Sequence, residues 1–342
     1  MFKQLSTIIR KRVSDTRNTE KGLFLNRAER VEPFSKEILD EVSSICTDRL
    51  ENYYDIKPFY SKLSSYLMVN INNILVTNGA EEAIRHIFNI HIKENDSIMY
   101  PIPTYGMYHV YSKIYNVKPI LLQYNDKFEI NKNILYDNLD KVSVFFLPNP
   151  SYIEDMFDLT EIKTILNQLN KHKGILVIDE TYFGFGSKTM MKLIDTYKNL
   201  YIIRSFSKTF GLPSIRVGCL LSNPENMKII SNYRSAYEIS YPSLKIAEYF
   251  LDNIDLVNNY IQECIKGRNF LISECLSQKI IFNGSQNYLF NIKIENEEIC
   301  NQICNNLEDN YIYVRNFKQY IAITIGPEEY MKEFMKKFMK LL

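Results

Sequence analysis

From about residue 73 onward, short β-rich segments alternate with amphipathic helical patterns, and this alternation restricts the possible folds more than any other feature of the chain. Strands are predicted at 74–77, 97–99, 120–122, 143–147, 175–178 and 201–203. Helices are predicted between them at 81–90, 105–115 and 159–171. Because strands that alternate with helices form a mostly parallel sheet with helices on both faces, we expect an α/β domain here.

Past about residue 234 the pattern changes to long helices followed by separate strands. The helices are predicted within 243–276, and the strands at 288–294, 311–314 and 320–325. The last helix has its apolar residues on one face and its lysines elsewhere, which fits a helix that closes a core; a basic helix that binds a membrane or a partner is the alternative. We expect a large domain at 45–235 and a smaller α+β domain that combines 1–44 with 236–342.

The charge of the chain is balanced, with 41 Lys and Arg residues, 40 Asp and Glu residues and a net charge of +1. Such a chain has no long-range field that would attract a nucleic-acid backbone or an anionic membrane. Its longest apolar runs, 144–147 and 174–178, are far shorter than the roughly 20 residues of a membrane-spanning helix. We therefore expect a small-molecule or protein partner, with no nucleic acid and no membrane.

Three further features concern location and metals. The N-terminus carries basic residues at 10–12 but no apolar stretch before a cleavage site, which predicts a cytoplasmic protein. The six cysteines are scattered and indicate reduced thiols. The four histidines show no ligand-like clustering, so no metal site is expected.

The strongest chemical motif is Ser-Phe-Ser-Lys at 205–208, directly after a predicted strand and followed by Arg216. A lysine at a strand end, flanked by hydroxyls and followed by a cation, suits a Schiff base beside a bound phosphate. A surface lysine in a polar loop is the alternative interpretation.

A second motif is the strand at 177–178 that ends in Asp179, Glu180, Thr181 and Tyr182. Open α/β sheets bind ligands at the carboxyl ends of their strands. A carboxylate there can hold a proton on a pyridine nitrogen, and a phenol can bind a phenolate oxygen. N-capping of a helix by Asp179 is the alternative.

Other loops at predicted strand ends carry polar or aromatic groups. Residues 76–81 form a strand, a turn at Gly79 and a helix start, whose backbone N–H groups can bind a phosphate; a plain turn is the alternative. This motif is neither a P-loop nor a dinucleotide-binding GxGxxG sequence. Tyr105 offers a face for stacking, and Asn149 offers an amide to a ring oxygen.

In type and order, these motifs resemble those of the fold-type I pyridoxal 5′-phosphate-dependent aminotransferases of class I and II, in particular the histidinol-phosphate aminotransferases. The resemblance implies that Lys208 forms a Schiff base with the cofactor, that Asp179 pairs with its pyridine nitrogen, and that Tyr182 and Asn149 bind its ring oxygen. It assigns the cofactor phosphate to the turn of Gly79, Ala80 and Glu81 with Ser205, Ser207 and Arg216, and ring stacking to Tyr105. Tyr53 matches the tyrosine that reaches the partner subunit's cofactor, which implies a homodimer with shared active sites.

The chain departs from the family pattern at three places. The family's Asn-Pro-Thr-Gly reads Asn-Pro-Ser-Tyr at 149–152, and its N-terminal Asn-Glu-Asn-Pro reads Ala-Glu-Arg-Val at 28–31. The family's Leu-Arg-Ile-Thr-Val-Gly, whose arginine binds the substrate α-carboxylate, reads Ile-Ala-Ile-Thr-Ile-Gly at 321–326. Ala322 cannot supply that bidentate pair, whereas Arg315 matches the family arginine that contacts a substrate phosphate.

Together, these features predict an aminotransferase that acts on a small phosphorylated substrate, for example one that converts a three-carbon phosphorylated ketone to its amine. The residues predicted to bind the substrate are Arg315, Tyr53, Asn149 and Arg30. An amino-acid donor is also expected, with its carboxylate held by Arg27, Arg30 or Lys318. One alternative is a decarboxylase of a phosphorylated amino acid such as O-phosphoserine or O-phosphothreonine. Another is a non-catalytic protein that binds pyridoxal phosphate.

Overall fold

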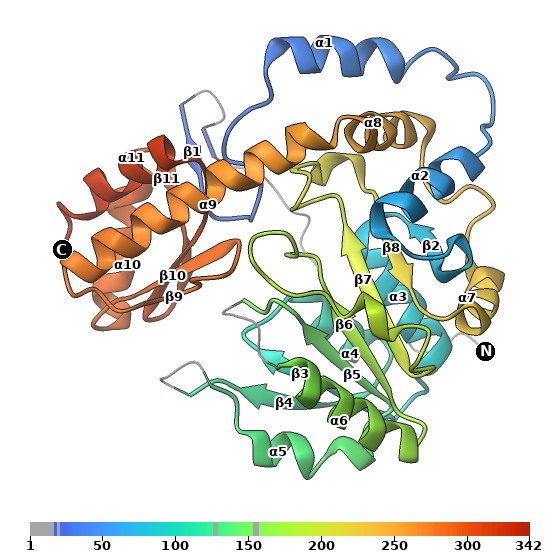
Figure 1. Ribbon diagram of the computed structural model, residues 1–342. Helices are drawn as coiled ribbons and strands as arrows, with labels where there is room; N and C mark the ends of the chain where they lie inside the picture. Colours follow the sequence, from blue (N-terminus) through green and yellow to red (C-terminus); the bar gives the residue numbers. More distant parts are fainter. Residues whose placement is uncertain (1–16, 19–20, 126–128, 153–156) are drawn as a thin grey trace.

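The computed structural model describes residues 17–18, 21–125, 129–152 and 157–342 (Figure 1). The basic stretch at 10–12 lies outside the described residues. Seven strands form a central sheet in the order β2-β8-β7-β6-β5-β3-β4. The strands are β2 (Ile74–Thr77), β3 (Ser97–Ile102), β4 (Lys118–Gln123), β5 (Val144–Pro148), β6 (Ile175–Asp179), β7 (Leu200–Ser205) and β8 (Gly218–Leu221).

Strands β4, β3, β5, β6 and β7 pair in parallel, while β8 pairs antiparallel with both β7 and β2. Because two antiparallel pairings restore the direction, β2 runs the same way as β7. The prediction of a mostly parallel sheet is therefore confirmed. The predicted strands 74–77 and 175–178 match β2 and most of β6, whereas β8 was not predicted.

Alternate residues of the central strands face two separate cores. In β5, Phe145 and Leu147 pack into one core, and Val144 and Phe146 pack into the other. Helices α2 (Lys57–Leu67) and α6 (Leu159–Lys171) cover the first face, and α3 (Gly79–His91) and α4 (Met107–Ile114) cover the second. Both faces are covered, which is why β5 is apolar and buried along its whole length.

Local signals explain where several helices begin. Asp158 and Glu161 form a reciprocal capping box at the start of α6, so the helix begins where the sequence predicts it. Two shorter helices, α5 (Lys132–Tyr136) and α7 (Pro224–Ile230), begin at capping side chains of Asn131 and Asn223.

The C-terminal part forms a second layer beside the central sheet (Figure 1). Its antiparallel sheet has the order β12-β13-β10-β9 and contains β9 (Phe282–Asn283), β10 (Leu289–Lys293), β12 (Arg315–Phe317) and β13 (Tyr320–Thr324). A parallel pair joins β1 (Leu23–Phe24) to β11 (Ile312–Tyr313), so the N-terminal segment lies against this part of the chain. The exact boundaries 1–44, 45–235 and 236–342 stay a prediction.

The remaining helices are α1 (Lys36–Ile45), α8 (Tyr241–Asp252), α9 (Ile254–Ser277), α10 (Glu297–Asp309) and α11 (Glu328–Phe338). The apolar face of α11 is buried, with Met331, Phe334 and Phe338 fully covered, and the helix packs against α9. This packing agrees with a helix that closes a core. None of the described helices is long and apolar enough to cross a bilayer.

A buried ion pair fixes the strand ends of β6 and β7. Arg204 donates through Nε to Oε2 of Glu180 at 2.7 Å, and the Glu180 side chain is fully buried. Thr189 and the backbone N–H of Met190 also donate to Glu180, which ties the loop after β6 to the sheet.

Replacing Arg204 with Met should lower the free energy of unfolding by about 3–5 kcal/mol, because Glu180 is left as an unpaired buried charge. Urea-induced unfolding followed by circular dichroism measures this difference. The matched control is Lys198→Ala, which breaks a pair with Glu225 in which both side chains are 71% exposed and should leave stability nearly unchanged. If Arg204→Met is as stable as the control, the buried pair has no such role.

Candidate active site

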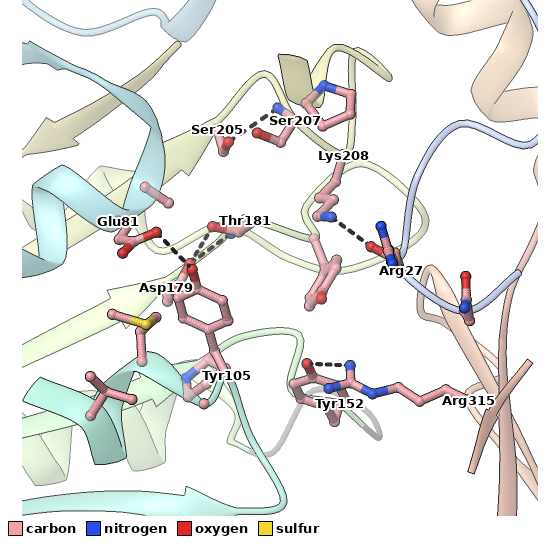
Figure 2. Close-up of a pocket in the computed structure, with 18 of the residues that line it drawn as sticks. Arg27, Glu81, Tyr105, Tyr152, Asp179, Thr181, Ser205, Ser207, Lys208 and Arg315 are labelled. Carbon is pink, nitrogen blue, oxygen red and sulfur yellow. Dashed lines mark hydrogen bonds between the residues drawn. The ribbon is translucent and has the colours of Figure 1, made fainter. Parts of the chain in front are cut away.

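A cavity of about 840 Å³ opens at the edge of the central sheet where β5, β6 and β7 end (Figure 2). It brings together ten of the residues predicted from the sequence: Ala80, Glu81, Tyr105, Asp179, Tyr182, Ser205, Ser207, Lys208, Arg216 and Arg315. These residues come from six separate segments of the chain, so the folded sheet is what assembles them.

Strand direction explains why these segments meet. The parallel strands β5, β6 and β7 end at Pro148, Asp179 and Ser205, and all three residues line the cavity. Strand β8 runs the opposite way and begins at Gly218, which pairs with Ser205 on one side and Thr77 on the other. The loop before β8 therefore returns to the same edge and carries Arg216 into the cavity.

One end of the cavity is suited to an anion. Gly79 has a φ of +73°, a left-handed conformation that favours glycine, and a Cβ there would lie 2.5 Å from Nη2 of Arg216, so the guanidinium would have to move. Nη1 of Arg216 donates to Oγ of Ser207 at 3.5 Å. Helix α3 begins at Gly79, and its N-terminus adds the positive end of its dipole.

The carboxylate of Asp179 is buried and bonded at both oxygens. The hydroxyl of Tyr108 donates to Oδ2 at 2.7 Å. The backbone N–H and the hydroxyl of Thr181 donate to Oδ1 at 3.0 and 2.5 Å. Burial raises the pKa of Asp179, and these hydrogen bonds oppose the shift because they favour the charged form. The carboxylate is thus held in one orientation, facing the cavity.

Lys208 is half-buried and points across the cavity toward the N-terminal segment (Figure 2). Its Nζ donates to the backbone oxygen of Arg27 at 3.1 Å. Burial lowers the pKa of Lys208 to about 8; Glu29 opposes this shift, while Arg216 and Arg315 add to it. A lysine with such a pKa has a substantial neutral fraction near neutral pH and is a better nucleophile than an ordinary one.

Two phenols and an amide lie around this centre. Tyr105 lines the cavity, and its hydroxyl donates to Glu81 at 3.2 Å (Figure 2). Tyr182 lines the cavity, and burial, with smaller contributions from Tyr152, raises its pKa well above the ordinary value. Asn149 is buried directly beyond β5, and its Oδ1 has no hydrogen-bond partner among the described residues.

The small antiparallel sheet of the C-terminal part contributes another wall of the cavity. Arg315, the first residue of β12, donates through Nη1 to the hydroxyl of Tyr152 at 2.9 Å (Figure 2). Its guanidinium also lies 4.7 Å from the centre of the Phe317 ring. The cavity therefore contains two arginines besides Lys208: Arg216 from the loop before β8 and Arg315 from the small sheet.

Five predicted residues are not among those that line the cavity: Gly79 and Asn149, which adjoin the lining residues Ala80 and Pro148, and Tyr53, Arg30 and Lys318. Tyr53 is 82% exposed, and its ring stacks on Tyr237 at 4.2 Å. Arg30 pairs with Glu32 at 2.8 Å and lies over the ring of Tyr260, away from the lining residues. Lys318 lines a neighbouring cavity. Of the three groups considered for a donor carboxylate, Arg27 alone is among the residues that line the site.

Sequence reasoning missed three residues of the site. Tyr108 and Thr181 hold Asp179, and Tyr152 contacts Arg315. Tyr108 lies one helical turn beyond Tyr105, and Thr181 is two residues after Asp179, so both were within reach of a local spacing argument. Nothing in the local sequence pairs Tyr152 with Arg315.

The residues present fit the cofactor that the family resemblance implies. The turn at Gly79 beside Arg216, called the anion cradle below, suits the cofactor phosphate. Asp179 suits the ring nitrogen of the cofactor. The buried amide of Asn149, whose Oδ1 has no partner among the described residues, suits a ring oxygen. When bound, pyridoxal 5′-phosphate supplies an electron-accepting ring. The chain supplies the amine of Lys208, which can attach the cofactor and move a proton.

Uptake of added pyridoxal 5′-phosphate by the cofactor-free protein should become faster with rising pH through a midpoint near the Lys208 pKa of about 8, since only the neutral amine is a nucleophile. Stopped-flow absorbance measures the rate. Arg315→Gln should move the midpoint upward, because the neighbouring cation helps to lower the pKa. A midpoint above about pH 10, as in an unperturbed lysine, would contradict the burial of this amine.

Comparisons with known proteins agree with this geometry. The family model for aminotransferase class I and II matches residues 49–338. A histidinol-phosphate aminotransferase of Caldanaerobacter subterraneus subsp. tengcongensis is 30% identical over 260 residues, which make up 75% of this chain and 72% of the relative.

Solved structures share the fold. Histidinol-phosphate aminotransferase from Sinorhizobium meliloti, in complex with pyridoxal-5'-phosphate, superposes with a TM-score of 0.82 at 15% identity, covering 93% of this chain and 91% of that one. L-threonine-O-3-phosphate decarboxylase from Porphyromonas gingivalis has a TM-score of 0.73 at 17% identity, covering 92% and 98%. At these identities the likeness concerns the fold alone.

The family match spans most of the chain, and the cavity holds the lysine, the aspartate and the anion cradle that the family chemistry requires. The predicted α/β fold, with a mostly parallel sheet and a smaller second part, is confirmed by the same matches. The chain belongs to the aminotransferase class I and II family, and its cofactor is pyridoxal 5′-phosphate.

Proposed function

We propose that this enzyme transfers an amino group to a small phosphorylated keto compound, for example a three-carbon phosphorylated ketone. The observation that supports this substrate class is the second cation of the cavity. Arg315 comes from the small sheet and Arg216 from the loop before β8, both line the cavity, and both cations add to the lowering of the pKa of Lys208 by burial. One anion site suits the cofactor phosphate, and the other suits a phosphate on the substrate.

The names of the matched relatives support the same class, since histidinol phosphate is itself a phosphorylated compound. In this proposal Asp179 keeps a proton on the ring nitrogen, and Tyr182 with Asn149 orients the ring oxygen. Lys208 carries a proton to or from the substrate carbon next to the amino group. Arg315 fixes the far end of the substrate so that this carbon stays near Lys208.

The second candidate is decarboxylation of a phosphorylated amino acid such as O-phosphoserine or O-phosphothreonine. The observation that favours it is Ala322, which is 1% exposed and carries no group that binds a carboxylate. A carboxylate that is not clamped can turn out of the ring plane and leave. The similar fold of a phosphothreonine decarboxylase agrees with this candidate.

The proposed assembly is a homodimer in the cytoplasm, in which Tyr53 of each subunit reaches the cofactor of the other. Its support is the position of Tyr53, which is 82% exposed and does not line the cavity of its own chain. The third interpretation, a silent cofactor-binding protein, requires the loss of Lys208 or Asp179, and both residues line the cavity.

Absorbance spectra of the cofactor-loaded protein separate these functions. With L-glutamate or L-alanine, transamination converts the bound cofactor to its amine form and shifts the absorbance band. With O-phospho-L-serine, decarboxylation releases carbon dioxide while the original band persists. Lys208→Ala should abolish either response, and the exposed Lys192→Ala is the matched control. If no amino compound changes the spectrum of the loaded wild-type protein, the proposed function is wrong.

Asp179→Asn should lower kcat by at least about a hundredfold, because the asparagine removes the preorganised charge opposite the ring nitrogen. Steady-state kinetics with the donor identified above measure this loss. Cofactor binding should weaken much less, since the phosphate cradle of Gly79 and Arg216 is intact. Thr181→Val, which removes one of the hydrogen bonds to Asp179, is the milder control. Equal kcat values for wild type and Asp179→Asn would remove Asp179 from the mechanism.

A further inference from the structure

Tyr152 joins the central sheet to the small sheet at the wall of the cavity. It follows β5 after a short loop, and both of its polar ends contact the small sheet. Its backbone oxygen accepts a hydrogen bond from Nδ2 of Asn291 at 3.1 Å. Its hydroxyl accepts one from Nη1 of Arg315 at 2.9 Å. These two partners lie on β10 and β12, which flank β13 on either side.

Ala322 of β13 lies between these two partners. The register pairs Ala322 with Asn291 on one side and with Arg315 on the other. Residues paired in this way project from the same face of a sheet. Because Tyr152 contacts both neighbours, it bridges the face above Ala322. Exposures of 1% for Ala322 and 5% for Tyr152 agree with a covered face.

The two cavities that Tyr152 lines support the same position for this residue. Tyr152 lines both the 840 Å³ cavity and a neighbouring one of about 510 Å³. Arg315 lines the first cavity, and Asn291 lines the second. The tyrosine is therefore part of the partition between them, at the position where a long side chain at 322 would otherwise project.

Tyr152 also restricts the motion of Arg315. The guanidinium lies 5.3 Å from the centre of the Tyr152 ring and 4.7 Å from that of Phe317, and the hydroxyl accepts one of its N–H groups. A guanidinium has five N–H donors in a rigid plane, so one bond to Tyr152 orients the others. An oriented group loses less conformational freedom when it binds an anion.

We propose that Tyr152 is a specificity-determining residue: it occupies the sheet face above Ala322 and orients Arg315 toward a single anionic group of the substrate. Glycine is the residue that the family pattern has at this place, and arginine is the one it has at 322. The tyrosine at 152 and the alanine at 322 therefore change the same part of the structure. The inference rests on the proposed function only in taking the anionic group to be a phosphate.

The first experiment titrates the cofactor-loaded protein with inorganic phosphate by isothermal titration calorimetry. Tyr152→Phe keeps the ring and removes only the hydroxyl, and it should raise the Kd by about three- to tenfold, because Arg315 must then be ordered when the phosphate binds. Arg315→Gln should raise it at least as much. Tyr115→Phe is the matched control, because that hydroxyl donates to Asn89 away from the cavity. An unchanged Kd in Tyr152→Phe overturns the orienting role.

The second experiment tests the covered face by a double-mutant cycle on thermal unfolding. Ala322→Met should lower the melting temperature by several degrees in the wild-type background, because the longer side chain meets Tyr152. In a Tyr152→Ala background the same change should cost less than half as much. Ala247→Met, also fully buried, should show additive effects with Tyr152→Ala. Additive effects at 322 overturn the proposal; if the methionine prevents folding, Ala322→Val is measured in the same backgrounds.

The two experiments separate this inference from the proposed function. If the wild-type protein does not bind phosphate, the phosphorylated substrate and the orienting role both fail, while the unfolding cycle still decides whether Tyr152 covers Ala322. If phosphate binds equally to wild type and Tyr152→Phe, the proposed substrate class stands and the role of Tyr152 fails.

Discussion

The common direction of the central strands is the constraint on which the rest of this site depends. Because β5, β6 and β7 run in parallel, their carboxyl ends lie at the same edge of the sheet, and the loops after them meet there. The single reversal at β8 serves the same edge, because its first residue, Gly218, lies beside Gly79 and Ser205. A Cβ on Gly218 would lie 2.7 Å from the backbone carbon of Gly79, so the anion cradle depends on two glycines in contact.

Several charged side chains lie close together in the cavity, and they affect one another's pKa values. Burial is the main cause of the lowered pKa of Lys208, and Arg216 and Arg315, which stay charged, add to it. The carboxylate of Asp179 is buried too, and it depends on donors from Tyr108 and Thr181. Anions bound at the two arginines would neutralise the cations that lower the pKa of Lys208, so binding and reactivity at this amine are coupled.

The departures of this chain from the family pattern lie next to the small sheet. The residues predicted to hold the cofactor line the part of the cavity at the edge of the central sheet. The proposed substrate end is made by β12 and the loop after β5, and the chain departs from the family pattern in that loop, at 151–152, and on the neighbouring strand β13, at Ala322. These positions are far apart in the sequence, and the hydrogen bonds of Tyr152 with Asn291 and Arg315 bring them together. Variation at one end of the cavity can therefore change the substrate while the chemistry at Lys208 is kept.

Local patterns in the sequence determined most of the elements and the cofactor end of the site. The strand at 74–77 and the helix at 159–171 have the predicted bounds, because period and capping are local properties. The helix at 36–45 was not predicted, although Ile38, Val42 and Ile45 are spaced as on one face of a helix; none of its residues is fully buried. Order along the strands was enough to gather Asp179, Lys208 and Arg216. Only the tertiary structure decided that Arg30 lies over the ring of Tyr260, and that Tyr152 bridges the neighbours of Ala322. Those contacts depend on strand register and on how elements far apart in the sequence pack, and neither is encoded in the spacing of nearby residues.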